Sequence, residues 1–196
     1  MNLNRIAVLI TCHNRRKLTL ASLDSLFRQR AVQDMEIEAF LVDDGCTDGT
    51  AAAVRERFPF VHILRGDGTL YWNRGMRLAF SAALRGGFDG YILLNDDTIL
   101  YKDALERVTS LARERMATGS PAIITGSTRS PLTGMQSYGG FLRCKRGLLF
   151  SLEMIEAHPS RAISCATMNG NFALIPGAIV QVLGNLEERF HHQFDI

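Results

Sequence analysis

Two pairs of adjacent aspartates stand where apolar stretches of this sequence end. Asp43 and Asp44 close the run "EAFLVDD", and Asp96 and Asp97 close the run "YILLNDD". An unpaired carboxylate is costly to bury, so each pair should meet water, a cation or a partner. One such pair is readily explained by helix capping or a solvated turn. Two pairs at neighbouring strand ends instead favour a Mg²⁺ or Mn²⁺ site completed by substrate phosphates.

The stretch "YILLNDDTIL" raises a further question about its two carboxylates. A strand is expected over residues 90–97, which would place Asp96 and Asp97 at its end. Because adjacent strand residues point to opposite faces, this placement predicts different roles for the two side chains.

Short apolar runs alternate with helical patterns along most of the chain. Such alternation indicates an α/β fold with a parallel sheet covered on both faces. Ligands of these sheets bind beyond the carboxyl ends of the strands, so "TCHNRR", "VDDGCTDGT" and "LNDDT" should converge on one edge. Strands are expected over residues 5–11, 37–45, 60–66, 90–97 and 121–127, and helices over residues 16–29, 47–58, 74–87 and 101–116.

The pattern changes in the last third of the chain. Residues 128–168 are rich in Gly and Ser, which predicts loops and hairpins. A strand and a helix beginning at Pro176 then follow, because the fixed φ of proline suits a first helical turn. The chain stops soon afterwards without a closing element. Residues 1–196 are therefore expected to form a single domain that is truncated at its C-terminus.

Two common ways of binding a nucleotide are excluded by the turn after the first expected strand. An acidic residue after the second strand can bind the ribose of NAD, but that fold needs a Gly-rich turn after the first strand. The segment "TCHNRRK" contains no glycine, and a Walker-type phosphate loop is absent. A nucleotide would therefore have to be held through a metal ion and cationic side chains.

Composition narrows the class of protein. The 196 residues are 46% hydrophobic with a net charge of +2, which fits one globular domain, and no basic tract marks a dedicated nucleic-acid binder. Four cysteines lie far apart without a C-x-x-C pair, which argues against a zinc site of the usual kind and favours free thiols (Cys12, Cys46, Cys144 and Cys165). Without a signal peptide or a membrane span, the protein is expected to be cytoplasmic, with membrane association at the inner face left open through regions missing here.

Five segments in order resemble the inverting glycosyltransferases of family 2 over nearly the whole chain: "VLITCHNR", "LVDDGCTDGT", "LYWNRGMRLAF", "LLNDDT" and "NGNFALIPGAIVQVLGNLEERF". The resemblance implies the GT-A fold, a Rossmann-like, mostly parallel sheet flanked by helices. It also implies transfer of a sugar from a nucleoside-diphosphate donor to a glycan or lipid-linked acceptor, with Mg²⁺ or Mn²⁺ as cofactor. The segment "GDGTLYWNRGM" together with "NDD" is most similar to a bacterial branch of rhamnosyltransferase-like enzymes that build cell-surface polysaccharides.

The same resemblance implies roles for the aspartates. Asp97 would ligate the metal that bridges the diphosphate, and Asp96 would lie near the ribose or the sugar. The metal would neutralise the leaving group as the glycosidic bond breaks. Asp44, or failing that Asp43, would contact the nucleotide base.

Nucleotide contacts are also implied for residues outside the aspartate pairs. Thr11, His13 and Arg15 follow the first strand and would line the nucleotide, with Arg15 near phosphate. His13 stands where relatives often carry an aromatic ring. Arg74 would pair with a phosphate oxygen as a bidentate donor, and Arg77 is the alternative.

The acceptor side is implied by the later segments. Backbone around Asn169 and Gly170 would wall the sugar pocket. Inversion needs a base that takes the proton of the acceptor hydroxyl, and Asp195 matches the carboxylate that relatives use. Trp72, the sole tryptophan, either stacks on a ligand or packs in the core.

Two other functions fit part of the pattern. One is a nucleotide-sugar-binding module without chemistry. The other is a metal-dependent nucleotidyltransferase, which predicts a Gly-rich, basic signature straight after the first strand. The segment "TCHNRRK" supplies the charge without the glycines.

Overall fold

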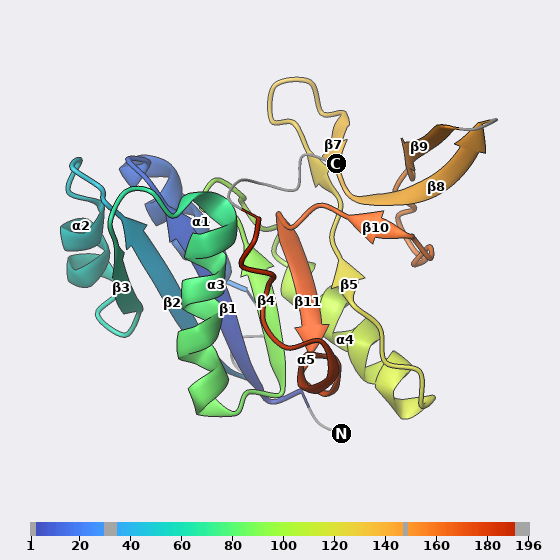
Figure 1. Cartoon of the computed structure of the whole chain (residues 1–196), viewed down its shortest axis with the longest axis horizontal. Helices are drawn as coiled ribbons and strands as arrows, with labels where there is room; N and C mark the ends of the chain where they lie inside the picture. Colours follow the sequence, from blue (N-terminus) through green and yellow to red (C-terminus); the bar gives the residue numbers. More distant parts are fainter. Residues whose placement is uncertain (1–2, 30–34, 147–148, 191–196) are drawn as a thin grey trace.

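A six-stranded sheet forms the centre of the computed structural model, which describes residues 3–29, 35–146 and 149–190. Its strands are β1 (Arg5–Cys12), β2 (Glu36–Asp44), β3 (His62–Gly66), β4 (Gly90–Leu94), β5 (Ile124–Thr125) and β11 (Phe172–Pro176). Their order is β3-β2-β1-β4-β11-β5 (Figure 1). Strands β1 to β4 pair in parallel, whereas β11 runs antiparallel to β4 and β5. The predicted mostly parallel sheet is confirmed.

Helices cover both faces of this sheet, as the sequence predicts. The helices are α1 (Arg16–Phe27), α2 (Thr50–Arg57), α3 (Tyr71–Ala83), α4 (Ala104–Ala117) and α5 (Gly177–Leu183), and the 3₁₀ turn η2 (Leu84–Gly86) extends α3. Buried side chains of α1, α2 and α4 pack on one face, and those of α3 and α5 pack on the other. Among the described residues, no helix is long and apolar enough to cross a membrane.

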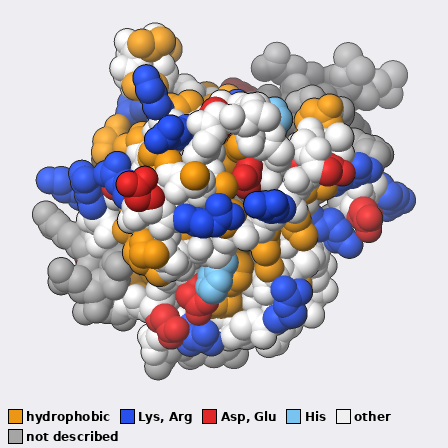
Figure 2. Space-filling view, turned by 90° about the vertical axis from the view of Figure 1, so that its left-hand side faces the viewer, with side chains coloured by type: hydrophobic (Ala, Val, Ile, Leu, Met, Phe, Trp, Pro, Cys, Tyr) orange, Lys and Arg blue, Asp and Glu red, His pale blue; other side chains and the backbone are white. Residues whose placement is uncertain are grey.

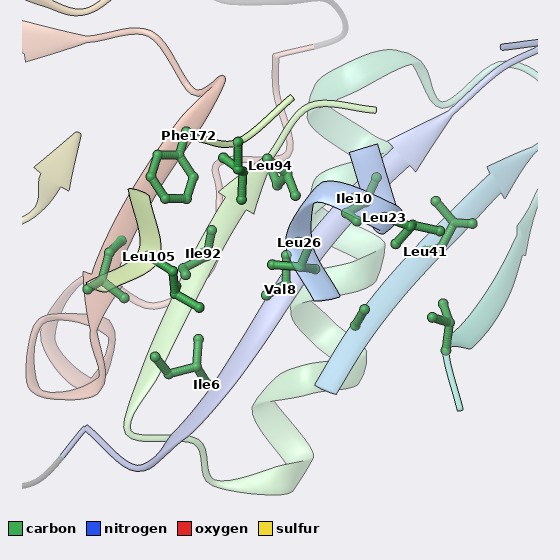
Figure 3. Packing of buried hydrophobic residues seen from close by; sticks show 14 of the residues in the cluster. Ile6, Val8, Ile10, Leu23, Leu26, Leu41, Ile92, Leu94, Leu105 and Phe172 are labelled. Carbon is green, nitrogen blue, oxygen red and sulfur yellow. The ribbon is translucent and has the colours of Figure 1, made fainter. Parts of the chain in front are cut away.

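Strand β1 is the centre of the core. Its side chains alternate between the two faces: Ile6, Val8 and Ile10 point to the layer of α1 and α4, whereas Ala7 and Leu9 point to α3. Figure 3 shows Val8 beside Leu26 and Ile10 beside Leu23, both leucines of α1. All five side chains are fully buried. Burial of each larger side chain contributes roughly 1.5–3 kcal/mol, so the end of β1 is firmly placed.

Loops and hairpins occupy residues 128–146 and 149–168, as predicted. A two-stranded ribbon pairs β6 (Thr128–Arg129) with β7 (Gln136–Tyr138). A second sheet has the order β10-β8-β9 and lies beside the main sheet in Figure 1. Its strands are β8 (Gly140–Arg146), β9 (Leu149–Met154) and β10 (Thr167–Met168).

Several expected boundaries were wrong, and one of them matters for the site. Strand β4 ends at Leu94, so Asp96 and Asp97 belong to a turn in which the Thr98 amide donates to the Asn95 carbonyl at 3.1 Å. The argument from strand alternation therefore does not apply to them. Pro176 is the last residue of β11, with ψ 143°, and α5 begins one residue later.

Charged side chains are spread over the face nearest α2 and β3. Figure 2 shows Lys and Arg side chains there in several separate groups, with Asp and Glu side chains between them. Part of this mixture consists of ion pairs, such as Arg5 with Glu36 at 3.0 Å and with Glu38 at 3.2 Å.

Asp48 joins the beginnings of two helices. Its carboxylate accepts from the Arg16 amide at 2.9 Å and from the Thr50 amide at 3.1 Å, the first residues of α1 and α2. Gly49, with φ 79°, lies between Asp48 and α2. These bonds satisfy amides that have no partner within their helices, so Asp48 caps both helices.

Replacing Asp48 with alanine is expected to lower the free energy of unfolding by about 1 kcal/mol, the usual contribution of a side-chain helix cap. Hydrogen bonds from Thr50 and from the Arg16 amide lower the pKa of Asp48. The stabilisation is therefore present at neutral pH and is lost as the pH falls through that lowered value. Denaturant unfolding at neutral and acidic pH measures both effects.

Asp103 offers a matched control. It also precedes a helix, but its side chain makes no capping hydrogen bond. Asp103→Ala should change stability much less than Asp48→Ala at neutral pH. Equal losses in the two variants would contradict the capping role.

Candidate functional site

A cavity of about 1160 Å³ opens at the carboxyl ends of β1, β2 and β4. The segments after these three strands meet at one edge of the sheet, as the sequence predicts. The opposite wall comes from residues 127–138, which include the ribbon of β6 and β7. Residues singled out from the sequence that line the cavity are Thr11, His13, Arg15, Asp44, Trp72, Asp96 and Asp97.

One guanidinium group holds both aspartates of the "NDD" turn. Arg15 Nη1 donates to Asp97 Oδ2 at 2.9 Å and to Asp96 Oδ1 at 3.3 Å. The Asp96 side chain is 9% exposed and that of Asp97 is 40% exposed. Burial raises the pKa of Asp96 to about 6, the positive charge of Arg15 opposes this rise, and the charge of Asp97 adds to it. The turn thus presents carboxylate oxygens to the cavity beside a cationic group.

Asp44 is the most heavily hydrogen-bonded carboxylate of the cavity wall. Its side chain is almost fully buried and accepts from the amides of Gly68 at 2.8 Å, Leu70 at 3.0 Å and Tyr71 at 3.1 Å. These residues lead into α3, so the carboxylate also lies at a helix N-terminus, where negative charge is favoured. A Cβ atom at Gly66 would lie 2.4 Å from Asp44 Oδ1, so the neighbouring strand must carry glycine there. Asp44 therefore fixes the segment 67–71.

The turn after β1 is tied to the loop after β2. His13 Nδ1 lies 2.5 Å from the Asp44 carbonyl oxygen, and Nε2 lies 3.1 Å from the side-chain nitrogen of Asn14. The carbonyl can only accept, so Nδ1 carries the hydrogen. Asn14, with φ 52°, accepts from the Thr47 amide at 2.7 Å. His13 thus supports the wall with one edge of its ring.

Trp72 is held at the cavity wall from two sides. Its indole Nε1 donates to Asn95 Oδ1 at 2.7 Å. Behind the ring lies Gly170, where a Cβ atom would be 2.6 Å from Trp72 Cζ2. The half-buried ring therefore packs against the protein and borders the cavity, and its stacking on a ligand stays a prediction.

Four other predicted site residues are not among the described residues that line the cavity: Asp43, Arg74, Asn169 and Gly170. The Asn169 amide donates to the Gly139 carbonyl at 3.1 Å, which joins β10 to the neighbouring ribbon. Asp43 accepts from the Cys46 amide at 2.9 Å.

Arg77, the alternative phosphate donor, contacts the end of the described chain. Its guanidinium donates to the Leu186 carbonyl at 2.5 Å and to Glu188 Oε2 at 3.3 Å. Asp195, the predicted general base, and the pair His191–His192 fall outside the described residues. The role of Asp195 therefore stays a prediction.

Three tyrosines of the cavity wall were missed by sequence reasoning. Tyr71, Tyr101 and Tyr138 all line it, and their exposed fractions are 55%, 67% and 46%. Exposed aromatic faces with a hydroxyl group suit contacts with sugar or base rings. Tyr101 could have been predicted from its position shortly after the "NDD" turn. Tyr138 could not, because it lies in a hairpin that has no clear sequence pattern.

Solved structures similar to this chain have the GT-A fold of nucleotide-sugar enzymes. The mannosyltransferase PcManGT from Pyrobaculum calidifontis, in complex with GDP-Man and Mn²⁺, has a TM-score of 0.59 at 18% identity, covering 94% of this chain and 48% of that one. TarS 1–349 from S. aureus has a TM-score of 0.58 at 15% identity, covering 91% and 49%, and its complex with UDP has a TM-score of 0.57 at 13% identity, covering 91% and 48%. This chain thus spans about half the length of each of these solved chains.

The fold and the site together define a GT-A domain with an acidic turn at the strand ends. The sequence model described as glycosyl transferase family 2 matches residues 7–167, which is most of the chain. The chain therefore belongs to glycosyltransferase family 2. Among curated proteins, none matches it significantly.

Asp44→Asn is expected to lower the free energy of unfolding by about 2 kcal/mol or more. The asparagine side chain keeps only one acceptor oxygen. Its NH₂ group would face a backbone amide, and because both groups are donors, buried donors would be left without acceptors. Denaturant unfolding followed by Trp72 fluorescence measures the loss close to the affected segment. Asp43→Asn is the control because that carboxylate accepts a backbone hydrogen bond from the Cys46 amide alone among the described residues, and its replacement should cost clearly less. A larger loss for Asp43→Asn would contradict the anchoring role of Asp44.

Proposed function

We propose that this chain binds a nucleoside-diphosphate sugar and transfers its sugar, with inversion, to a glycan or lipid-linked acceptor. The observation that carries the proposal is the cavity at the strand ends, where Arg15 and the carboxylates of Asp96 and Asp97 meet in a family 2 chain. The GDP-Man and Mn²⁺ bound by one similar structure, and the UDP bound by another, support a donor of this kind.

The "NDD" turn fits a hard divalent cation. Its donors are carboxylate oxygens, the ligands that Mg²⁺ and Mn²⁺ prefer. Asp97 is the half-exposed carboxylate at the cavity and would hold the ion, with Asp96 beside it. When bound, the ion would supply positive charge that stabilises the departing diphosphate.

Arg15 would work together with that ion. Its guanidinium and a divalent cation compete for the same two carboxylates. Displacement from them would free Arg15 to donate to a phosphate oxygen, which planar guanidinium groups bind well. Arg15 thus belongs to the proposed donor site whether or not the ion is bound.

The finer assignments complete the proposal. Asp195 would act as the base that takes the acceptor proton. Asp44 would present its remaining acceptor capacity, or its backbone, to the base of the nucleotide. A rhamnosyl-type donor and polysaccharide synthesis at the cytoplasmic face of a bacterial membrane rest on the segment "GDGTLYWNRGM".

Calorimetry with UDP, GDP and dTDP, each with and without Mn²⁺, tests the proposal. Metal-dependent binding of a nucleoside diphosphate is expected, followed by transfer or hydrolysis of the matching nucleotide sugar by the complete protein. Preference for a free nucleoside triphosphate would overturn it in favour of a nucleotidyltransferase. Donor binding without turnover would instead indicate a binding module.

Asp97→Ala is expected to remove the gain in nucleotide affinity that Mn²⁺ provides, while thermal stability stays unchanged because the side chain is half-exposed. Calorimetric titration of UDP with Mn²⁺ present measures the change. Asp103→Ala is the control, since this exposed carboxylate is not among the described residues that line the cavity. Equal affinity in wild type and Asp97→Ala would rule out the metal role of Asp97.

Arg15→Ala should shift two affinities in opposite directions. Binding of Mn²⁺ by itself should tighten by about two- to fivefold, because a partly exposed ion pair no longer competes for the carboxylates. Binding of the nucleoside diphosphate with Mn²⁺ should weaken by about tenfold or more, because a charged hydrogen-bond donor is lost. Calorimetry resolves both constants.

Arg16→Ala is the matched control for Arg15→Ala. Arg16 is the next residue, and the ion pairs of Asp96 and Asp97 within the described chain are made with Arg15 and not with Arg16. Its replacement should change both affinities little. Weaker binding of Mn²⁺ by itself in Arg15→Ala would show that Arg15 positions the carboxylates rather than competing for them.

A further inference from the structure

Two cysteines that are far apart in the sequence meet at the edge of the cavity. Cys12 ends β1, Cys46 follows β2, and their Sγ atoms lie 3.8 Å apart. Asp43 is the residue of β2 that pairs with Cys12 in the sheet register. One ligand atom from each of the three residues lies within 4.8 Å of the other two. The wide sequence spacing had argued against such a cluster.

The distance between the two sulfur atoms distinguishes possible uses of the pair. A disulfide requires about 2.05 Å between sulfurs, far less than is observed. In a tetrahedral zinc site, two bonds of about 2.3 Å separate the sulfurs by roughly 3.8 Å. The observed separation thus equals that of two thiolates bound to one tetrahedral ion. A weak thiol–thiol contact is the competing explanation.

We propose that Cys12, Cys46 and Asp43 form a binding site for a thiophilic divalent cation such as Zn²⁺. Two sulfurs and one carboxylate oxygen favour Zn²⁺ over Mg²⁺ and Mn²⁺, which prefer oxygen ligands. Three protein ligands leave the fourth tetrahedral position for water or another ligand. This site is chemically distinct from the oxygen-only "NDD" turn.

One backbone amide favours a thiolate at Cys46, whereas burial opposes thiolates at both cysteines. The Asn14 amide lies 3.2 Å from Cys46 Sγ and donates to it, which stabilises negative charge on that sulfur. Burial raises the pKa of both thiols, so a binding ion must displace their protons, and two protons leave for each ion bound. The ion's two positive charges replace them beside the carboxylate of Asp43.

Such an ion would join the turn after β1 to the loop after β2. Cys12 is followed directly by His13 and, after Asn14, by Arg15. Cys46 lies beside Thr47, which Asn14 already contacts. Zn²⁺ should therefore stiffen the segment that carries Arg15. The inference does not depend on the proposed transferase activity, and either can fail without the other.

Titration of the reduced, chelator-treated protein with Zn²⁺, and with Co²⁺ as a spectroscopic probe, tests the site. Wild type should bind one ion, show a cobalt–thiolate charge-transfer band and melt at a higher temperature with Zn²⁺. Cys46→Ser should lose the band, and Asp43→Asn should keep it while affinity falls by about tenfold or more. Cys165→Ser is the control, because Cys165 is exposed and lies outside the cluster, and it should match wild type.

Cys12 is almost fully buried, so Cys12→Ala is preferred to Cys12→Ser, and it too should abolish the band. Wild type provides a readout that needs no variant. Zn²⁺ should slow alkylation of Cys46 by about tenfold or more, measured by peptide mass spectrometry, and leave Cys165 unaffected. Unchanged Zn²⁺ affinity in Cys46→Ser, or loss of Zn²⁺ binding in Asp97→Ala instead, would overturn the site. Absence of Zn²⁺ protection at Cys46 would overturn it as well.

Discussion

The buried carboxylate of Asp44 is the interaction on which the cavity wall depends. It lies where β2 ends and binds three amides of the segment that leads into α3. That helix carries Trp72, so the carboxylate also determines where the indole meets the cavity. Its backbone carbonyl holds the ring of His13. The Asp44 carboxylate can be buried because each hydrogen bond it accepts satisfies a backbone amide that would otherwise lack a partner.

The carboxylates of the "NDD" turn are balanced in a different way. Two carboxylates and one guanidinium leave an excess of negative charge in the "NDD" turn. Under the proposed function, a divalent cation would restore neutrality there and free the guanidinium for a diphosphate. The carboxylate at the end of β2 accepts from backbone amides, whereas those after β4 are paired with the half-exposed guanidinium of Arg15. The latter are therefore the better ligands for an exchangeable ion.

Much of this arrangement is predictable from the sequence, because it follows from strands that are continuously apolar. The runs that form β1, β2 and β4 are apolar on both faces, so a covered parallel sheet and a polar edge are the consequence. The predictions that failed concern features set by contacts between segments that are far apart in the sequence. The strand ahead of Asp96 stops at Leu94, three residues before its expected end, because Asn95 begins a turn and also binds Trp72. Likewise, Cys12 and Cys46 are neighbours because β1 pairs with β2, which no sequence spacing reveals.

The five residues from Thr11 to Arg15 show how a buried strand positions a site. Thr11 packs so closely on α3 that a Cβ atom at Gly75 would lie 2.2 Å from its hydroxyl oxygen. The next four residues reach the Cys46 thiol, the Asp44 carbonyl, the Thr47 amide and the "NDD" carboxylates in turn. Each successive residue thus binds a different segment. The core packing of β1 fixes the point in space from which this turn starts. A soft ion at Cys12 and a hard ion at Asp97 would consequently act on one short turn from its two sides, so occupancy of either site should be felt at Arg15.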